Sequence, residues 1–149
     1  MAMIQLHPDF KEFLRLLNSN EVRYLLIGGH AVGFHGHPRA TGDMDIWIPV
    51  DRENASRISR AVRQFGISAR EATESLFLER DKVIRMGVPP IRVELQTGIS
   101  GVDFEECYAQ RVIAEVDGIP VNIISLPMLK KNKQASGRLK DLDDLRQLP

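Results

Sequence analysis

The chain has 149 residues, a length typical of one compact domain, so we expect one domain over residues 1–149. Hydrophobic residues make up 43% and charged residues 27% of the chain, a balance too apolar for a disordered protein and too polar for a membrane protein. Twenty Lys and Arg residues balance twenty Asp and Glu residues, which argues against a broad basic face for nucleic acid; a basic patch must be local.

Cys107 is the only cysteine, so an intramolecular disulfide and a cysteine-based zinc knuckle are excluded. The first residues lack a basic segment followed by a long apolar run, and no stretch approaches the ~18 apolar residues that span a bilayer. The sequence therefore predicts a cytoplasmic protein with no membrane partner. The spacing of His30, His35 and His37 matches no common zinc pattern, so we expect them to be surface or core residues.

The first third of the chain predicts a helix, a strand and a second helix. Pro8 can occupy a first helical turn, and apolar residues then recur at helical spacing until Asn18–Asn20. A short apolar strand is expected over Val22–Ile27. Gly28 and Gly29 should end this strand before a short helix over His30–His35.

The middle of the chain predicts three strands and two helical segments. After a turn-like stretch at 37–42 we expect a strand over Asp43–Val50 and an amphipathic helix over Asp51–Gln64, capped by Asp51. A looser helical stretch is expected over Thr73–Arg80. Strands are expected over Lys82–Met86 and Ile91–Gln96, joined by Gly-Val-Pro-Pro as a hairpin.

The last third predicts a hairpin followed by helix. Strands over Arg111–Val116 and Ile119–Ile124 flank an Asp-Gly pair, which favours a tight turn. Ser125 is expected to cap a final helical region that Gly137 divides. Taken together, the elements predict an α+β fold with a mixed sheet flanked by helices.

Two aspartates on one strand are the first sign of chemistry. Asp43 and Asp45 are separated by one residue, so in a strand their side chains point to the same face from Cα atoms roughly 6.5 to 7 Å apart. Two like charges so placed repel unless a cation neutralises them, and hard oxygen ligands suit Mg²⁺ or Mn²⁺. Asp43 alone is also compatible with capping the preceding turn.

Glu94 supplies a third carboxylate, on a strand where apolar and polar residues alternate. If this strand lies beside that of Asp43, the three carboxylates can hold two metal ions about 3.5 to 4 Å apart, which activates an attacking oxygen and neutralises a leaving phosphate. The alternative is an ordinary surface charge, because alternating strands normally expose polar residues.

Gly28 and Gly29 leave backbone N–H groups open to an anion at the start of a helix, so a nucleotide phosphate can dock there. The string Gly-Gly-His-Ala-Val-Gly is neither a P-loop nor a Rossmann fingerprint. Two glycines alone more often simply form a tight turn between a strand and a helix.

Together, GGHAVGFHGHPRATGDMDIWI and the later IRVEL resemble the nucleotidyltransferase superfamily, with its polymerase-β-like fold. The resemblance is closest to small bacterial proteins of the AbiEii and minimal-nucleotidyltransferase types, which carry further residues on either side of the carboxylates. The matching positions here are Arg39, Thr41, Lys133, Arg138, Lys140, Asp141 and Asp144.

This resemblance implies Mg²⁺-dependent transfer of a nucleoside monophosphate from ATP or another NTP to a hydroxyl or phosphate acceptor, with release of pyrophosphate. Asp43, Asp45 and Glu94 would be the catalytic residues and metal ligands. The nucleotide would be bound by Gly28, Gly29, Arg39, Thr41, Lys133 and Arg138. Asp141 would orient a basic partner. Glu94 departs from the family, which usually carries Asp there, and one extra methylene displaces the carboxylate.

Two other functions remain open. The first is a catalytically decayed module that binds a nucleotide or a partner, such as one component of a toxin–antitoxin pair. The second is a metal-dependent hydrolase or nuclease that uses the same carboxylates on water. The acceptor is not readable from the sequence, since relatives use tRNA, proteins and small molecules, and a partner protein or a homodimer is expected to complete the site.

Overall fold

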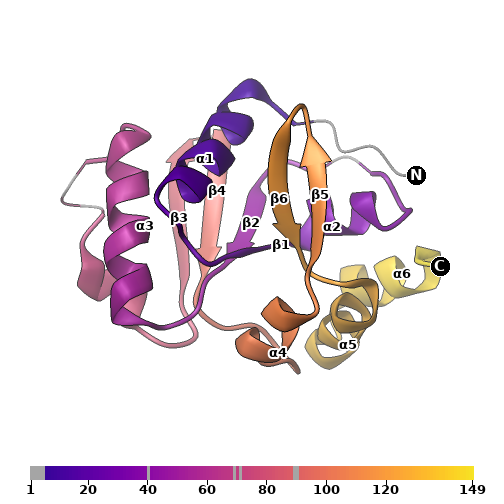
Figure 1. Ribbon diagram of the computed structural model, residues 1–149. Coiled ribbons are helices and arrows are strands. Elements are labelled where there is room, and N and C mark those ends of the chain that lie inside the picture. Colours follow the sequence, from indigo (N-terminus) through magenta and orange to yellow (C-terminus); the bar gives the residue numbers. More distant parts are fainter. Residues whose placement is uncertain (1–5, 40, 69, 71, 89–90) are drawn as a thin grey trace.

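A computed structural model of the chain describes residues 6–39, 41–68, 70, 72–88 and 91–149. Within these residues, six strands form one mixed sheet in the order β3-β4-β2-β1-β6-β5 (Figure 1). Their bounds are β1 (Leu25–Ile27), β2 (Met44–Trp47), β3 (Val83–Val88), β4 (Ile91–Gln96), β5 (Val112–Val116) and β6 (Ile119–Ile123).

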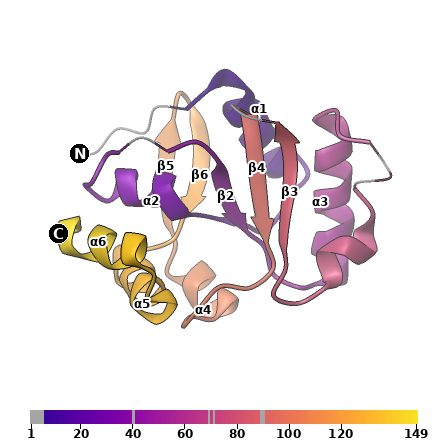
Figure 2. The same ribbon diagram turned by 180° about the vertical axis from the view of Figure 1, so that it is seen from behind.

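Helices lie against the sheet and gather beyond one end of it. In Figure 1, α1 crosses in front of the sheet and α3 stands beside it, while α4, α5 and α6 group below; Figure 2 shows the same grouping from behind. The bounds are α1 (Pro8–Ser19), α2 (Gly28–Phe34), α3 (Arg52–Gln64), the 3-10 helix η1 (Glu74–Leu78), α4 (Phe104–Ala109), α5 (Leu126–Ser136) and α6 (Leu139–Gln147).

Strand pairing confirms the mixed α+β sheet and both predicted hairpins. β3 pairs with β4 and β5 with β6, both antiparallel. In the centre, β1 runs antiparallel to β2 and parallel to β6, and β2 runs parallel to β4. Pro89 and Pro90 of the predicted β3–β4 connection lie outside the described residues.

The predicted amphipathic helices bury their apolar faces on the sheet. Phe13 and Leu17 of α1 and Ile58 of α3 are fully buried, as are Ile46 and Leu95 of the central strands. Burial of each such side chain contributes ~1.5 to 3 kcal/mol to folding. Buried apolar residues from all these elements belong to one contiguous cluster.

Two helix caps are as predicted. The Asp51 side chain accepts a hydrogen bond from the Asn54 N–H at the start of α3, and the Ser125 hydroxyl accepts one from the Met128 N–H at the start of α5. Gly137 adopts a left-handed conformation with φ of 67° and divides the final helical region, as expected.

The first two strands are shorter than predicted. The strand expected over Val22–Ile27 begins at Leu25, because the Val22 N–H closes α1 on the Leu17 carbonyl and the Arg23 N–H donates to the Asn54 side chain. The strand expected over Asp43–Val50 is Met44–Trp47, and Pro49, which has no N–H to donate, follows its end.

Helix boundaries also differ. The first short helix begins at Gly28 rather than His30, and the helical stretch expected over Thr73–Arg80 is a five-residue 3-10 helix. Helix α4 was not predicted, because six residues are too few to show a helical period. Cys107 of α4 is buried in the core, where burial raises the pKa of its thiol to about 11.

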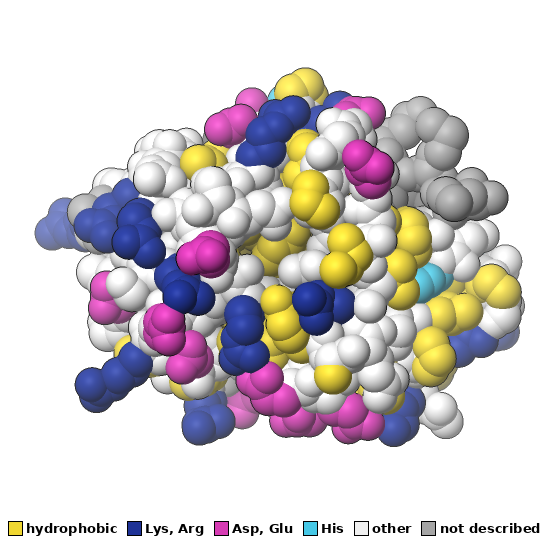
Figure 3. Space-filling view, viewed as in Figure 1, with side chains coloured by type: hydrophobic (Ala, Val, Ile, Leu, Met, Phe, Trp, Pro, Cys, Tyr) yellow, Lys and Arg dark blue, Asp and Glu magenta, His cyan; other side chains and the backbone are white. Residues whose placement is uncertain are grey.

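In the described part of the chain, no helix combines the length and apolar character needed to cross a membrane. On the face seen in Figure 3, basic and acidic side chains are interspersed, in keeping with the balanced charge of the sequence.

Candidate active site

A cleft of about 650 Å³ runs between the sheet and the last two helices. Its walls come from the β1–α2 turn, the loop before β2, strands β2, β3 and β4, the loop after β4, and helices α5 and α6. The lining includes every residue predicted for the site: Gly28, Gly29, Arg39, Thr41, Asp43, Asp45, Glu94, Lys133 and Arg138.

The sheet brings Asp45 and Glu94 side by side. Strands β2 and β4 are parallel neighbours, and Asp45 and Glu94 are register partners, which confirms the adjacency that the metal-site hypothesis needs. Burial, a hydrogen bond to Glu94 and the charges of Glu94 and Asp43 together raise the pKa of Asp45 to about 7. Lys140 opposes this shift. Gln96 donates to Asp45 from 3.4 Å.

Two arginines neutralise the carboxylates of Glu94 and Asp43. Arg92 Nη2 lies 2.9 Å from Asp43 Oδ2, and Arg85 Nε lies 2.9 Å from Glu94 Oε1. We call Asp43, Asp45, Arg85, Arg92 and Glu94 the sheet cluster. Neither arginine is predicted as part of the site, although strand alternation places Arg92, two residues before Glu94, on the same face; Arg85 is the register partner of Glu94.

The sheet cluster fits a divalent cation in its donor chemistry. Asp45 and Glu94 offer hard oxygen donors whose charged forms repel one another, and a cation would relieve that repulsion. Among the residues that the structure describes, no three His, Cys, Asp or Glu side chains stand close enough to hold one ion together. A site with Asp43, Asp45 and Glu94 as three ligands stays a prediction.

Each glycine of the diglycine turn makes room for a side chain of the site. Gly28 has φ of 67°, and a Cβ there would lie 2.1 Å from Asp45 Oδ2. A Cβ on Gly29 would lie 2.4 Å from Thr41 Oγ1 and 3.4 Å from Arg39 Nη1. The glycines therefore form a tight turn, and they also allow side chains of the cleft to approach the backbone closely.

A second set of charges links the loop before β2 to α5 and α6. Arg39 donates to both carboxylate oxygens of Asp144, at 2.9 and 3.0 Å. Lys133 Nζ lies 3.2 Å from Asp141 and 3.1 Å from Asp144, and Arg138 Nε lies 2.8 Å from Asp141. We call Arg39, Lys133, Arg138, Asp141 and Asp144 the helix network.

Most of the helix network is buried. The side chains of Lys133, Asp141 and Asp144 are 7%, 1% and 2% exposed. Burial raises the pKa of Asp141, but hydrogen bonds from Arg138, Ser136 and Lys133 outweigh it and bring the pKa down to about 2. Arg39 and Lys133, predicted as nucleotide ligands, line the cleft but are engaged by these aspartates. Asp141 contacts basic partners, as the resemblance implied.

Lys140 and Arg138 carry the accessible positive charge on the helical wall. Arg138 is 76% exposed, and Lys140 lines the cleft and forms no salt bridge with any described residue. Trp47 shares the face of the aspartates, but it is 2% exposed and packs edge-on against Phe104, so it contributes to the core rather than the cleft.

Comparison with known proteins finds a similar fold and no similar family. No protein-family model and no curated protein matches the sequence. Among solved structures, the chain is similar to the crystal structure of a "putative nucleotidyltransferase" (TM1012) from Thermotoga maritima, at a TM-score of 0.62 and 19% sequence identity. The similarity covers 95% of this chain and 93% of that chain. The two proteins share a fold over nearly their whole lengths.

Proposed function

We propose that this protein is a Mg²⁺-dependent nucleotidyltransferase that moves a nucleoside monophosphate from an NTP to an acceptor hydroxyl or phosphate. The observation that carries the proposal is the pairing of Asp45 with Glu94 directly beside the Gly28 turn, within one cleft. The fold shared with the Thermotoga maritima protein supports it. We also propose that the protein belongs to the AbiEii-type subgroup and is cytoplasmic. A partner protein or a second copy of the chain is proposed to complete the site.

The residues of the cleft suit the parts of this reaction. No described side chain caps the start of α2, where Gly28 and Gly29 line the cleft, so its first N–H groups can bind the donor triphosphate, and Lys140 and Arg138 supply positive charge to it. When bound at Asp45 and Glu94, with Asp43 adjacent, Mg²⁺ would neutralise charge on the reacting phosphate. The acceptor oxygen attacks the α-phosphorus, the bond to pyrophosphate breaks, and a carboxylate of the sheet cluster accepts the acceptor proton.

Two measurements test the proposal. Calorimetry with ATP and the other NTPs should show binding that requires Mg²⁺ and is lost in Asp45→Asn. The protein should also transfer label from α-labelled NTP to a component of total RNA or cell extract, with release of pyrophosphate. Asp143→Asn on α6 is the matched control, because its carboxylate is 61% exposed and lies outside the cleft lining. Binding that is independent of Mg²⁺ and equal in Asp45→Asn would contradict the proposal.

One observation favours a second function. Arg85 and Arg92 already neutralise Glu94 and Asp43, and Glu94 stands where the superfamily usually has Asp. A decayed module that binds a nucleotide or a partner, as in a toxin–antitoxin pair, would keep such pairs permanently. Labelled product that disappears in Asp43→Asn would exclude this alternative, and the same assay without pyrophosphate release would point to a hydrolase or nuclease.

A further inference from the structure

Arg85 lines the cleft, and Arg92 lies on the same face of the sheet beside Asp43; nothing above assigns a ligand to either arginine. The sheet order β3-β4-β2-β1 places Arg85 and Arg92 on one side of Asp45, and the Gly28 turn at the end of β1 on the other. The carboxylates therefore separate two positive regions: Lys140 and Arg138 on the helical wall, and the arginine pair on β3 and β4.

The arginine of each pair reaches solvent, so it can be exchanged for another cation. The Arg85 and Arg92 side chains are 59% and 36% exposed, in contrast to the 7% exposure of Lys133. Ion pairs at the surface are weak, because water and salt screen them, so a competing cation can take the place of the arginines on the carboxylates. Each guanidinium then keeps a planar fork of donors, which matches the oxygens of a phosphate.

The geometry of transfer places the acceptor on the arginine side. In phosphoryl transfer the attacking and leaving oxygens lie roughly in line, so an acceptor enters opposite the departing pyrophosphate. If the triphosphate lies at the Gly28 turn, as the proposed function has it, the acceptor approaches from β3 and β4. A polycationic acceptor would meet two arginines there and be repelled, whereas a phosphate-bearing acceptor would be attracted.

We propose that Arg85 and Arg92 form a second phosphate-binding site, which receives a phosphate-bearing acceptor, a mononucleotide or the end of a polynucleotide, once a divalent cation engages the carboxylates. This inference rests on the proposed function. It makes the cation and the acceptor phosphate positively coupled ligands: each one releases the arginine–carboxylate pairs for the other, so each must raise the affinity for the other by the same factor.

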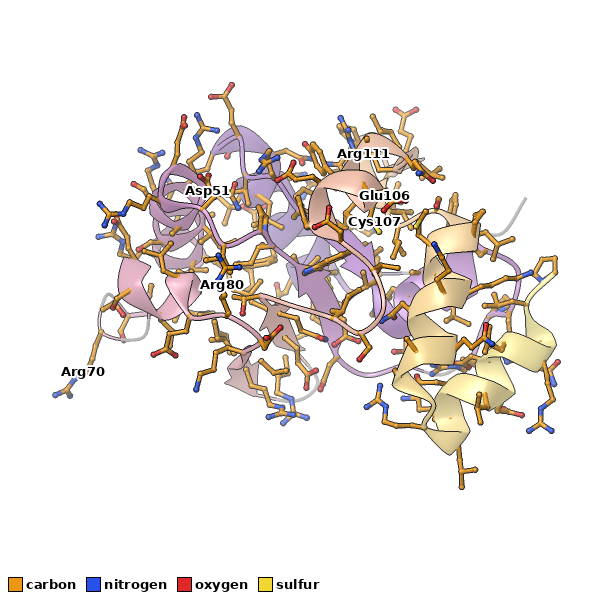
Figure 4. All side chains as sticks on the ribbon, turned by 90° about the horizontal axis from the view of Figure 1, so that it is seen from below. Asp51, Arg70, Arg80, Glu106, Cys107 and Arg111 are labelled. Carbon is orange, nitrogen blue, oxygen red and sulfur yellow. The ribbon has the colours of Figure 1, made fainter. Side chains whose placement is uncertain are left out.

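The coupling is tested with Arg85→Gln/Arg92→Gln, and Arg70→Gln serves as the matched control. Arg70 is exposed and points away from the molecule on the side opposite α5 and α6 (Figure 4). Mn²⁺ affinity without nucleotide, measured by the electron paramagnetic resonance of free Mn²⁺, should rise about 5- to 10-fold in the double variant, since two competing cations are removed. Arg70→Gln should match the wild-type protein.

The phosphate site is tested with the donor side saturated by Mg²⁺ and a non-hydrolysable ATP analogue. Fluorescence anisotropy of a labelled six-nucleotide RNA, and its competition by a nucleoside monophosphate, distinguish the two sources of phosphate. The ligand that binds the wild-type protein more tightly, RNA or nucleoside monophosphate, should bind the double variant at least 10-fold more weakly. If that ligand is the RNA, the slope of log K against log salt should also fall by about 1.4, or 0.7 for each lost contact. Arg85→Lys/Arg92→Lys should recover part of the affinity, because the charge remains.

The results separate this inference from the proposed function. Unchanged Mn²⁺ affinity in the double variant, or equal binding of both phosphate ligands by the double variant and the wild type, would overturn the inference. So would a cationic aminoglycoside that binds the wild-type complex more tightly than either phosphate ligand. Mg²⁺-independent binding of ATP by wild type and Asp45→Asn alike would instead overturn the proposed function. Circular dichroism melting confirms that each variant is folded.

Discussion

The sheet cluster and the helix network contain the same kinds of residue, yet they differ in what surrounds them. In the sheet cluster, carboxylates face one another and their arginines lie at the surface. In the helix network, two buried aspartates share three cations and a serine hydroxyl. Burial raises the pKa of Asp45, whereas hydrogen bonds lower that of Asp141 despite its burial. Charge composition therefore does not determine the pKa of a carboxylate in these two clusters; its burial and the cations that contact it do.

The largest expected effect comes from breaking the helix network at its centre. Lys133→Met leaves Asp141 and Asp144 buried with one cation fewer between them, which should lower the free energy of unfolding by ~3 to 5 kcal/mol. Urea denaturation measures this loss of stability. Arg138→Gln, at a side chain 76% exposed, is the control and should cost less than ~1 kcal/mol. Equal losses in the two variants would remove the distinction between buried and exposed members of the network.

The Gly28 turn should be the next most sensitive position. In Gly28→Ala the new Cβ meets Asp45 Oδ2 at 2.1 Å in a backbone with φ of 67°, so Asp45 must move. We expect a loss of ~1 to 3 kcal/mol in stability and at least ~10-fold in Mg²⁺-dependent ATP affinity. Gly42→Ala is the matched control, since no atom lies within 4 Å of its Cβ position, and it should change neither quantity by much. Denaturation measures the stability of the two variants, and calorimetry measures their ATP affinity.

Acid should weaken the helix network. The pKa of Asp141 is about 2 in the folded protein, below its ordinary value of 3.8, so its contribution is present above pH ~4 and is lost as the pH falls toward 2. The loss should be about 2 kcal/mol, with Asp144, whose pKa is also lowered, adding to it. Denaturation at several pH values between 6 and 2 measures this loss of stability. In Asp141→Asn, stability at pH 6 should be lower and the acid dependence shallower.

The sheet cluster should respond to pH in the opposite direction. The pKa of Asp45 is raised to about 7, so the neutral carboxyl is favoured in the folded protein and stability falls as the pH rises from ~4 through 7. Asp45→Asn cannot ionise and should be more stable than the wild type by at least ~1 kcal/mol at pH 8, with no difference at pH 4. Denaturation in EDTA tests this; a variant less stable at pH 8 would contradict it.

Removing an exposed arginine should have the smallest effect. Arg85→Gln breaks a pair whose guanidinium is 59% exposed, so we expect less than ~1 kcal/mol of lost stability, and less again in high salt. Denaturation at low and high salt checks this. A salt-independent loss of several kcal/mol would make the sheet cluster as rigid as the helix network.

Much of the fold is encoded in local patterns. The helical spacing of Phe10, Phe13 and Leu17, the Asp51 cap and the Asp-Gly turn each predict an element that the structure confirms, because periodicity and turn chemistry act within a few residues. Strand ends were less predictable. Whether Arg23 joins a ladder depends on Asn54, a residue 31 positions away.

The site, like the fold, depends partly on local sequence and partly on distant contacts. The sequence alone predicts the residue types and their spacing: Asp43 and Asp45 on one strand, Glu94 on another, and glycines before a short helix. Only the tertiary structure decided that Asp45 and Glu94 are register partners, that Arg85 and Arg92 neutralise Glu94 and Asp43, and that Lys133 is enclosed by two aspartates. Spacing is a local property of the chain, whereas burial and charge pairing depend on which distant segments the sheet and helices bring together.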